Sequence, residues 1–253
     1  MRKLLLFLLI LSLLPLSSRA QITSLNVEIK PFGHGWKQVV ENHGSSSIVA
    51  MHSPFQCEVQ TRRGSITSTI VYTYDFLTGY GTSRDIPPGG VERFDAPDPS
   101  TWSGGVDAVI FSDGHSEGDP KGVSALYQRR QGFYNGIIEA LQLLDTIANQ
   151  GANPAEVADS VHLRSESLAK HGTKANDEWV GLTELYSGLE SLLRAQKLRW
   201  VPSDSTPYPQ PTIEEVAKVN GIPRQQAHAI ALSKRYDELK ADLEGNLEPP
   251  AGK

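Results

Sequence analysis

The chain has 253 residues, with 24 Lys and Arg against 29 Asp and Glu, which gives a formal net charge of -5. An acidic chain is not drawn non-specifically to nucleic acid or to anionic lipid, so the charge excludes these as non-specific partners. The single cysteine, Cys57, excludes a disulfide within this chain and a zinc site built from cysteines.

The first 20 residues have the pattern of a cleaved secretory signal peptide. Arg2 and Lys3 form a positive start, an uncharged run follows, and Ser18-Arg19-Ala20 is a small-x-small cleavage site before Gln21. The apolar run of about 11 residues is shorter than the roughly 20 that cross a bilayer, which disfavours a membrane anchor. We therefore predict a secreted or periplasmic protein without a membrane span after cleavage. Three basic and no acidic residues leave with the peptide, so the formal charge falls from -5 to -8.

Residues 21–119 have the pattern of an antiparallel β-sandwich. Short segments alternate apolar and polar residues, and turn-forming Gly, Pro, Asn and Ser residues separate them. The expected strands cover residues 25–30, 36–41, 47–52, 56–60, 66–74, 91–95 and 106–112. No helical periodicity intervenes, which favours a sandwich over an alternating α/β fold.

Two parts of this region resemble a known kind of module. Residues 39–50 form a strand-turn-strand pattern, and residues 86–94 contain the Pro87-Pro88-Gly89-Gly90 turn. Both motifs resemble those of immunoglobulin-like and fibronectin-like modules in secreted bacterial proteins, over residues 22–113. The resemblance implies an immunoglobulin-like sandwich for residues 21–119 and a role in adhesion, or in contact with protein or carbohydrate.

From Pro120 the apolar period becomes that of a helix, so an α-helical region is expected to follow the sandwich in an α+β fold. The expected helices cover residues 120–150, 154–170 and 174–198. Short connections favour one bundle over residues 120–199, packed on the sandwich. Gly132 and Gly136 lie inside the first helix, where each costs about 1 kcal/mol relative to alanine. A close approach to the sandwich or to a neighbouring helix explains them.

Residues 200–211 contain four prolines and are expected to form an extended connector. Residues 212–253 are expected to form a helical hairpin and a tail. Within them, residues 212–227 resemble the helix-turn-helix of bacterial repressors. However, the region from Thr212 to Lys253 has seven acidic residues against six basic ones, whereas DNA binding requires positive charge that faces phosphate. We therefore expect no nucleic-acid partner.

Acidic residues cluster just before the first helix. Asp113, Glu117 and Asp119, with His115 between them, occupy seven consecutive positions, and loop carboxylates are ligands that calcium prefers. These three carboxylates are therefore the candidate metal ligands. Asp113-Gly114 and Asp119-Pro120 also fit a turn and a helix cap, which is the alternative interpretation. Arg129 and Arg130 either pair with these carboxylates or lie in solvent.

Catalytic motifs give little support for an enzyme. The chain has no His-Glu-x-x-His, no phosphate-binding glycine loop and no dinucleotide fingerprint, and the serine-rich stretch 44–47 has the composition of a turn. We assign no catalytic or cofactor-binding residues and no cofactor, calcium aside. The expected function is that of an exported, non-catalytic binding or structural interaction protein with a protein or glycan partner. The alternative is an exported hydrolase that uses the carboxylates of the 113–119 loop, with or without a divalent cation.

Overall fold

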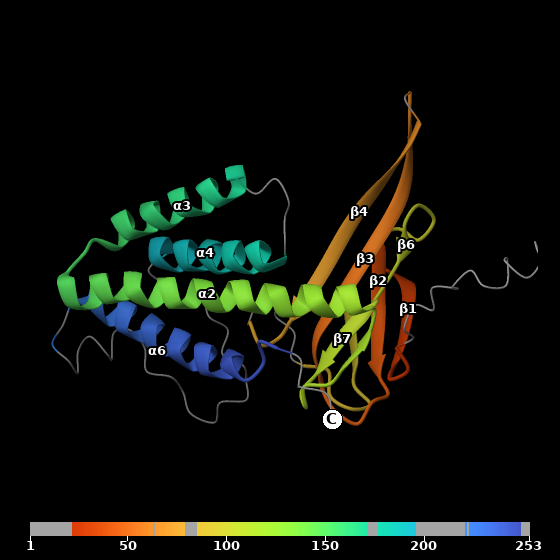
Figure 1. Ribbon diagram of the computed structural model, residues 1–253, viewed down its shortest axis with the longest axis horizontal. Helices are drawn as coiled ribbons and strands as arrows, with labels where there is room; N and C mark the ends of the chain where they lie inside the picture. Colours follow the sequence, from red (N-terminus) through yellow and green to blue (C-terminus); the bar gives the residue numbers. More distant parts are fainter. Residues whose placement is uncertain are drawn as a thin grey trace, which may run out of the picture.

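The computed structural model describes residues 22–62, 64–78, 85–171, 177–195, 221 and 223–248. The expected signal peptide, the connector 200–211 and the first part of the expected helical hairpin, residues 212–220, lie outside these residues. Antiparallel sheets fill the N-terminal half and four helices the C-terminal half, so the α+β prediction is confirmed. Figure 1 shows the two halves joined by the long helix α2, which runs from the sheets to the far end of the helices.

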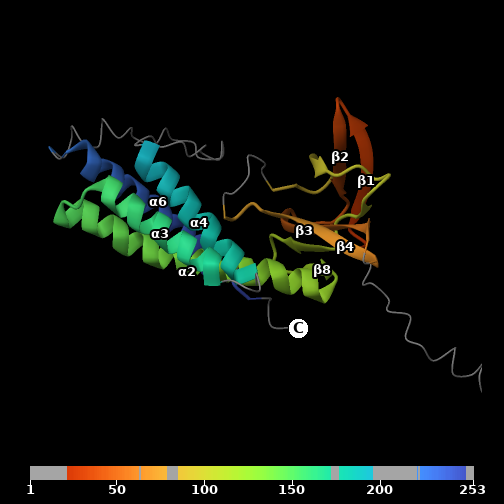
Figure 2. The same ribbon diagram turned by 90° about the horizontal axis from the view of Figure 1, so that it is seen from above.

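Two antiparallel sheets face each other in the N-terminal half (Figure 2). One contains β1 (Leu25–Phe32), β2 (Gly35–Asn42) and β5 (Val91–Ala96), in that order. The other has the order β4 (Gly64–Asp75), β3 (Ile48–Thr61), β7 (Ala108–Phe111) and β8 (Ser116–Gly118), and β6 (Ser103–Gly104) also pairs with β3. The core between them consists of Val40, Ile48, Met51, Ile86, Phe94, Val109 and Phe111.

The two strands expected at 47–52 and 56–60 are one strand, β3, because Pro54 does not interrupt it. The carbonyl of Pro54 accepts a hydrogen bond from Gly105 N at 3.2 Å, on the side away from β4. The N–H and C=O of a strand residue point to the same side, so the missing N–H of Pro54 faces the irregular stretch between β6 and β7. A proline there costs no ladder bond to β4.

Helix α2 (Pro120–Gln150) begins and ends at the predicted residues. The Asp119 side chain accepts a hydrogen bond from Lys121 N at 3.0 Å, and Pro120 follows it in the first turn. Gly151 ends the helix in the left-handed conformation, with φ of 72°. The first turns of α2 pack on the outer face of the β3–β7 sheet through Val123, Leu126 and Tyr127.

The rest of α2 packs with α3 (Pro154–His171), α4 (Asp177–Ala195) and α6 (Arg224–Glu244) around one apolar core. Helix α6 contributes Leu232, Tyr236 and Leu239 to this core, so it belongs to the same bundle as α3 and α4. None of the helices within the described ranges is long and apolar enough to span a bilayer.

The predicted close approach at Gly132 is confirmed, and the neighbour is α4. A Cβ atom at Gly132 would lie 1.7 Å from the carbonyl oxygen of Glu178, and one at Gly181 would lie 1.9 Å from that of Arg129. The two glycines let the backbones of α2 and α4 touch. No larger residue fits there without moving a helix.

Candidate interaction site

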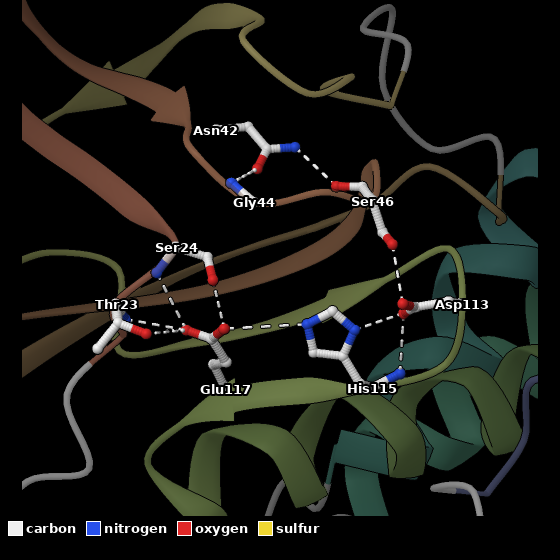
Figure 3. A network of polar contacts seen from close by, with 8 residues as sticks. All are labelled: Thr23, Ser24, Asn42, Gly44, Ser46, Asp113, His115 and Glu117. Carbon is white, nitrogen blue, oxygen red and sulfur yellow. Dashed lines mark hydrogen bonds and ion pairs between the residues drawn. The ribbon is translucent and has the colours of Figure 1, made fainter.

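Glu117 attaches the start of the described chain to β8 (Figure 3). Its carboxylate accepts hydrogen bonds from Thr23 N at 2.9 Å, from Ser24 N at 3.2 Å and from the Ser24 hydroxyl. Burial raises the pKa of Glu117, but the hydrogen bonds from Ser24 and Thr23 outweigh it, so the pKa lies below its ordinary value of 4.5. Glu117 therefore acts as a structural acceptor beside β1.

Asp113 and His115 order the turn between β7 and β8. Asp113 accepts a hydrogen bond from the Ser46 hydroxyl at 2.8 Å, which is the main cause of its lowered pKa. Nδ1 of His115 lies 2.5 Å from the same carboxylate (Figure 3). The imidazole also stacks on the Phe111 ring, with ring centroids 4.1 Å apart. Nε2 of His115 lies 3.9 Å from Glu117.

The three candidate metal ligands thus have separate roles. Asp113 orders a turn, Glu117 binds the segment before β1, and Asp119 caps α2. Across the described ranges, no three His, Cys, Asp or Glu side chains are arranged to hold a metal ion. The metal site stays a prediction.

One motif escaped the sequence interpretation: residues 114–118 read Gly-His-Ser-Glu-Gly, which is a Gly-x-Ser-x-Gly pattern. In hydrolases this pattern forms a sharp turn from strand to helix, whereas here Ser116 opens strand β8 and pairs with Ile110. Ser116 lines an open cavity of about 600 Å³ beside Tyr127 and Gln128. Successive side chains of a strand point to opposite faces of the sheet, so Ser116 and Glu117 point away from each other. The imidazole of His115 contacts the carboxylates of Asp113 and Glu117 and not the Ser116 hydroxyl.

Arg129 and Arg130 do not pair with the 113–119 carboxylates, so that part of the sequence interpretation is wrong. Arg130 binds Asp75 at the end of β4, with Nε 2.6 Å from Oδ2 and both side chains buried. Arg129 binds Glu184 of α4, with Nε 2.9 Å from Oε2. Both partners come from elements that pack beside α2 only after the chain has folded. They are far from the arginines in the sequence, so no local pattern predicts these ion pairs.

The end of the β3–β4 hairpin projects beyond all other strands (Figure 1). Strand β6 pairs with β3 only at Phe55 and Gln56. We call the part of the hairpin beyond these residues, 57–62 and 64–68, the arm. In the arm, β3 and β4 pair only with each other among the described strands. One face of the hairpin continues from buried Phe55 to exposed Ile70, Val59 and Ile66, whose exposed fractions are 37%, 42% and 55%.

Strand β4 also has an open edge, because none of the described strands pairs with its side away from β3. Ala50 lies opposite Asp75, and Phe76 N donates to Val49 O at 3.0 Å, which makes Ala50 and Asp75 a non-hydrogen-bonded pair. The two kinds of pair alternate along an antiparallel ladder, so even-numbered residues of β4 direct their backbone groups toward β3. The N–H and C=O groups that point away from β3 belong to Ser65, Thr67, Thr69, Val71 and Thr73.

This edge lacks the protection that other sheet edges have. Edge strands are usually short or carry charged residues, proline or a bulge. Strand β8 has only three residues, and β1 and β5 carry charged side chains, namely Glu28, Lys30, Glu92, Arg93 and Asp95. Strand β4 has 12 residues in continuous register, without a proline, and without a charged side chain before Asp75.

Comparison of the chain with protein-family models, with curated proteins and with solved structures finds no match. The immunoglobulin-like resemblance of residues 21–119 stays a prediction.

Proposed function

We propose that the chain is an exported, non-catalytic interaction protein that binds its partner by adding a strand to the open edge of β4. The observation that carries the proposal is this unprotected edge, with the outward backbone groups of five residues from Ser65 to Thr73. Strand addition uses such groups for affinity and neighbouring side chains for specificity. The signal-peptide pattern of residues 1–20 supports export.

The apolar face of the hairpin supports the same proposal. Ile66, Ile70 and Val59 lie on one face, and each is more than a third exposed. A strand added beside β4 would place its own alternate side chains next to Ile66 and Ile70 and remove part of their surface from water. Backbone pairing and apolar burial would then act together along the same strand.

Photo-crosslinking tests the proposal in the cells that produce the protein. A photoreactive residue at Thr67, on the open edge of β4, should give a defined crosslinked product. The same residue at Arg93, on the protected edge of β5, should give none. Adding Thr69→Pro removes an outward N–H and spares the bonds to β3, so it should abolish the product. The proposal fails if no product forms, or if Thr69→Pro leaves it unchanged.

A second candidate function, hydrolysis, is favoured by the Gly114–Gly118 pattern and by the cavity beside Ser116. In one version of the hydrolase, the carboxylates of Asp113 and Glu117 would hold a divalent cation. In the other version, the Ser116 hydroxyl would be the nucleophile. A fluorophosphonate probe separates the serine version from the interaction protein. Labelling that Ser116→Ala abolishes would favour the serine hydrolase, whereas an unlabelled chain would exclude the serine version.

A further inference from the structure

We propose that the strand added to β4 is the β4 strand of a second copy, in an antiparallel pair with its two-fold axis at Ser68. This inference rests on the proposed function and names the partner. It starts from the sequence Ile66-Thr67-Ser68-Thr69-Ile70, which reads the same in both directions. A two-fold axis through Ser68 therefore places identical residue types opposite each other.

The direction of the backbone groups permits this register. Thr67 and Thr69 both point their N–H and C=O groups away from β3, so Thr67 of one copy and Thr69 of the other can exchange two hydrogen bonds. Ser65 and Val71 pair in the same way, since both are outward-pointing. Ser68 would face its own symmetry mate in a non-hydrogen-bonded pair, where Cα atoms are about 4.5 Å apart.

The side chains suit the same arrangement. Ile66 would lie beside the partner subunit's Ile70 and Ile70 beside the partner subunit's Ile66, so that β-branched residues meet on the apolar face. The exposed fractions of 55% for Ile66 and 37% for Ile70 give both residues surface to bury. Thr67 would meet the partner subunit's Thr69 on the polar face, where hydroxyl pairs are favourable.

Charge favours a second copy over a partner with a charged strand. The chain carries a net charge of -5, so two copies repel each other at long range. Along β4 no charged side chain occurs before Asp75, which is buried against Arg130. Two copies can therefore meet at this edge without opposing like charges, whereas a charged strand would find no complementary charge there.

Cysteine crosslinking tests the register directly. Cys57 lies opposite Ser68 within one hairpin, so the background is Cys57→Ser. Ser68→Cys should then form a covalent dimer under mild oxidation, because Cα atoms about 4.5 Å apart suit a disulfide. Thr67→Cys and Thr69→Cys are the matched controls and should stay largely monomeric, because neither residue faces itself. Equal crosslinking at the three positions, or none at Ser68→Cys, would overturn the proposal.

A charge exchange tests the uncrosslinked dimer. Ser68→Lys or Ser68→Glu alone should weaken dimerisation in sedimentation experiments by at least about tenfold, because like charges then face each other. An equimolar mixture of the two variants should restore the dimer. If both single variants dimerise as the wild type does, self-pairing at Ser68 is wrong.

The two levels of the proposal fail in different ways. If Thr67 crosslinks to a different protein in a manner that depends on the β4 edge, while Ser68→Cys gives no dimer, strand addition stands and self-pairing is wrong. If Thr67 gives no product and Ser68→Cys gives no dimer, both are wrong.

Discussion

Arg130 of α2 donates two hydrogen bonds to Asp75 at the end of β4, from Nε at 2.6 Å and from Nη2 at 3.2 Å. Asp75 also accepts from Leu77 N at 3.1 Å, and Arg130 Nη1 reaches the carbonyl oxygen of Asn246 at 3.3 Å. One buried ion pair therefore joins the base of the open-edged strand to α2 and to the chain that follows α6. It fixes the hairpin, and hence its edge, to the helical half.

Arg130→Met should destabilise the fold by about 3–5 kcal/mol, because it leaves the Asp75 carboxylate buried without its partner. Lys37→Met is the matched control, since it breaks the exposed Lys37–Asp95 pair at 2.6 Å, where the expected loss is about 0–1 kcal/mol. The free energy of unfolding in denaturant measures both. Equal losses would show that the buried pair does not anchor the hairpin.

Gly132→Ala should destabilise the protein by about 1–3 kcal/mol, because its Cβ would collide with the backbone of Glu178 in α4. At an uncrowded helical position the same change would stabilise the helix by about 1 kcal/mol, so the sign of the effect is decisive. Gly245→Ala is the control, since no heavy atom outside its own chain neighbours lies within 4 Å of a Cβ there. Thermal unfolding measures both, and a stabilised Gly132→Ala variant would contradict the contact.

Acid should weaken the wild type partly through Glu117. Its pKa in the folded protein lies below the ordinary value of 4.5, so its stabilising contribution is complete above that value. The contribution is lost as the pH falls through the lower, folded pKa. Unfolding free energies between about pH 6 and pH 3 should therefore fall less steeply for Glu117→Gln than for the wild type, with Ser24→Ala in between. Identical slopes for Glu117→Gln and wild type would contradict this role.

Divalent cations should not stabilise residues 21–253, because Asp113, Glu117 and Asp119 already accept hydrogen bonds from protein groups. Thermal unfolding in EDTA is compared with unfolding in calcium, magnesium or zinc. A bound ion at a hundred times its dissociation constant would contribute about 2.7 kcal/mol, which is readily detected. A shift that Asp113→Asn and Glu117→Gln abolish would establish the metal site and favour the hydrolase.

Much of the fold follows from local patterns. The change from period two to helical period at Pro120 and the cap at Asp119 are local signals, and the structure has both elements there. The sequence pattern does not predict strand β8, because three residues show no periodicity, and it divides β3 into residues 47–52 and 56–60, on either side of Pro54. Whether a proline interrupts a strand depends on which side its missing N–H faces, and that is known only once the neighbouring strands are placed.

The site was harder to predict, because an edge exists only when the strand order is known. Strand β4 was expected from its alternation, but its position at the end of the sheet depends on β3 pairing with β7 across about sixty residues. The run from Gly64 to Tyr74 without a charge and the palindrome around Ser68 were present in the sequence. Both features indicate strand pairing, but neither belongs to a catalytic motif.

Residue-resolved amide hydrogen exchange of the purified chain distinguishes an occupied β4 edge from an open one. The amides of Ile66 and Ser68 point toward β3 and should be protected in either case. If β4 pairs with a second copy, the outward amides of Thr67 and Thr69 should be protected to a similar degree at high protein concentration, and Ser68→Lys should release them. Rapid exchange of Thr67 and Thr69 at every concentration, beside protected Ile66 and Ser68, would contradict self-pairing at this edge.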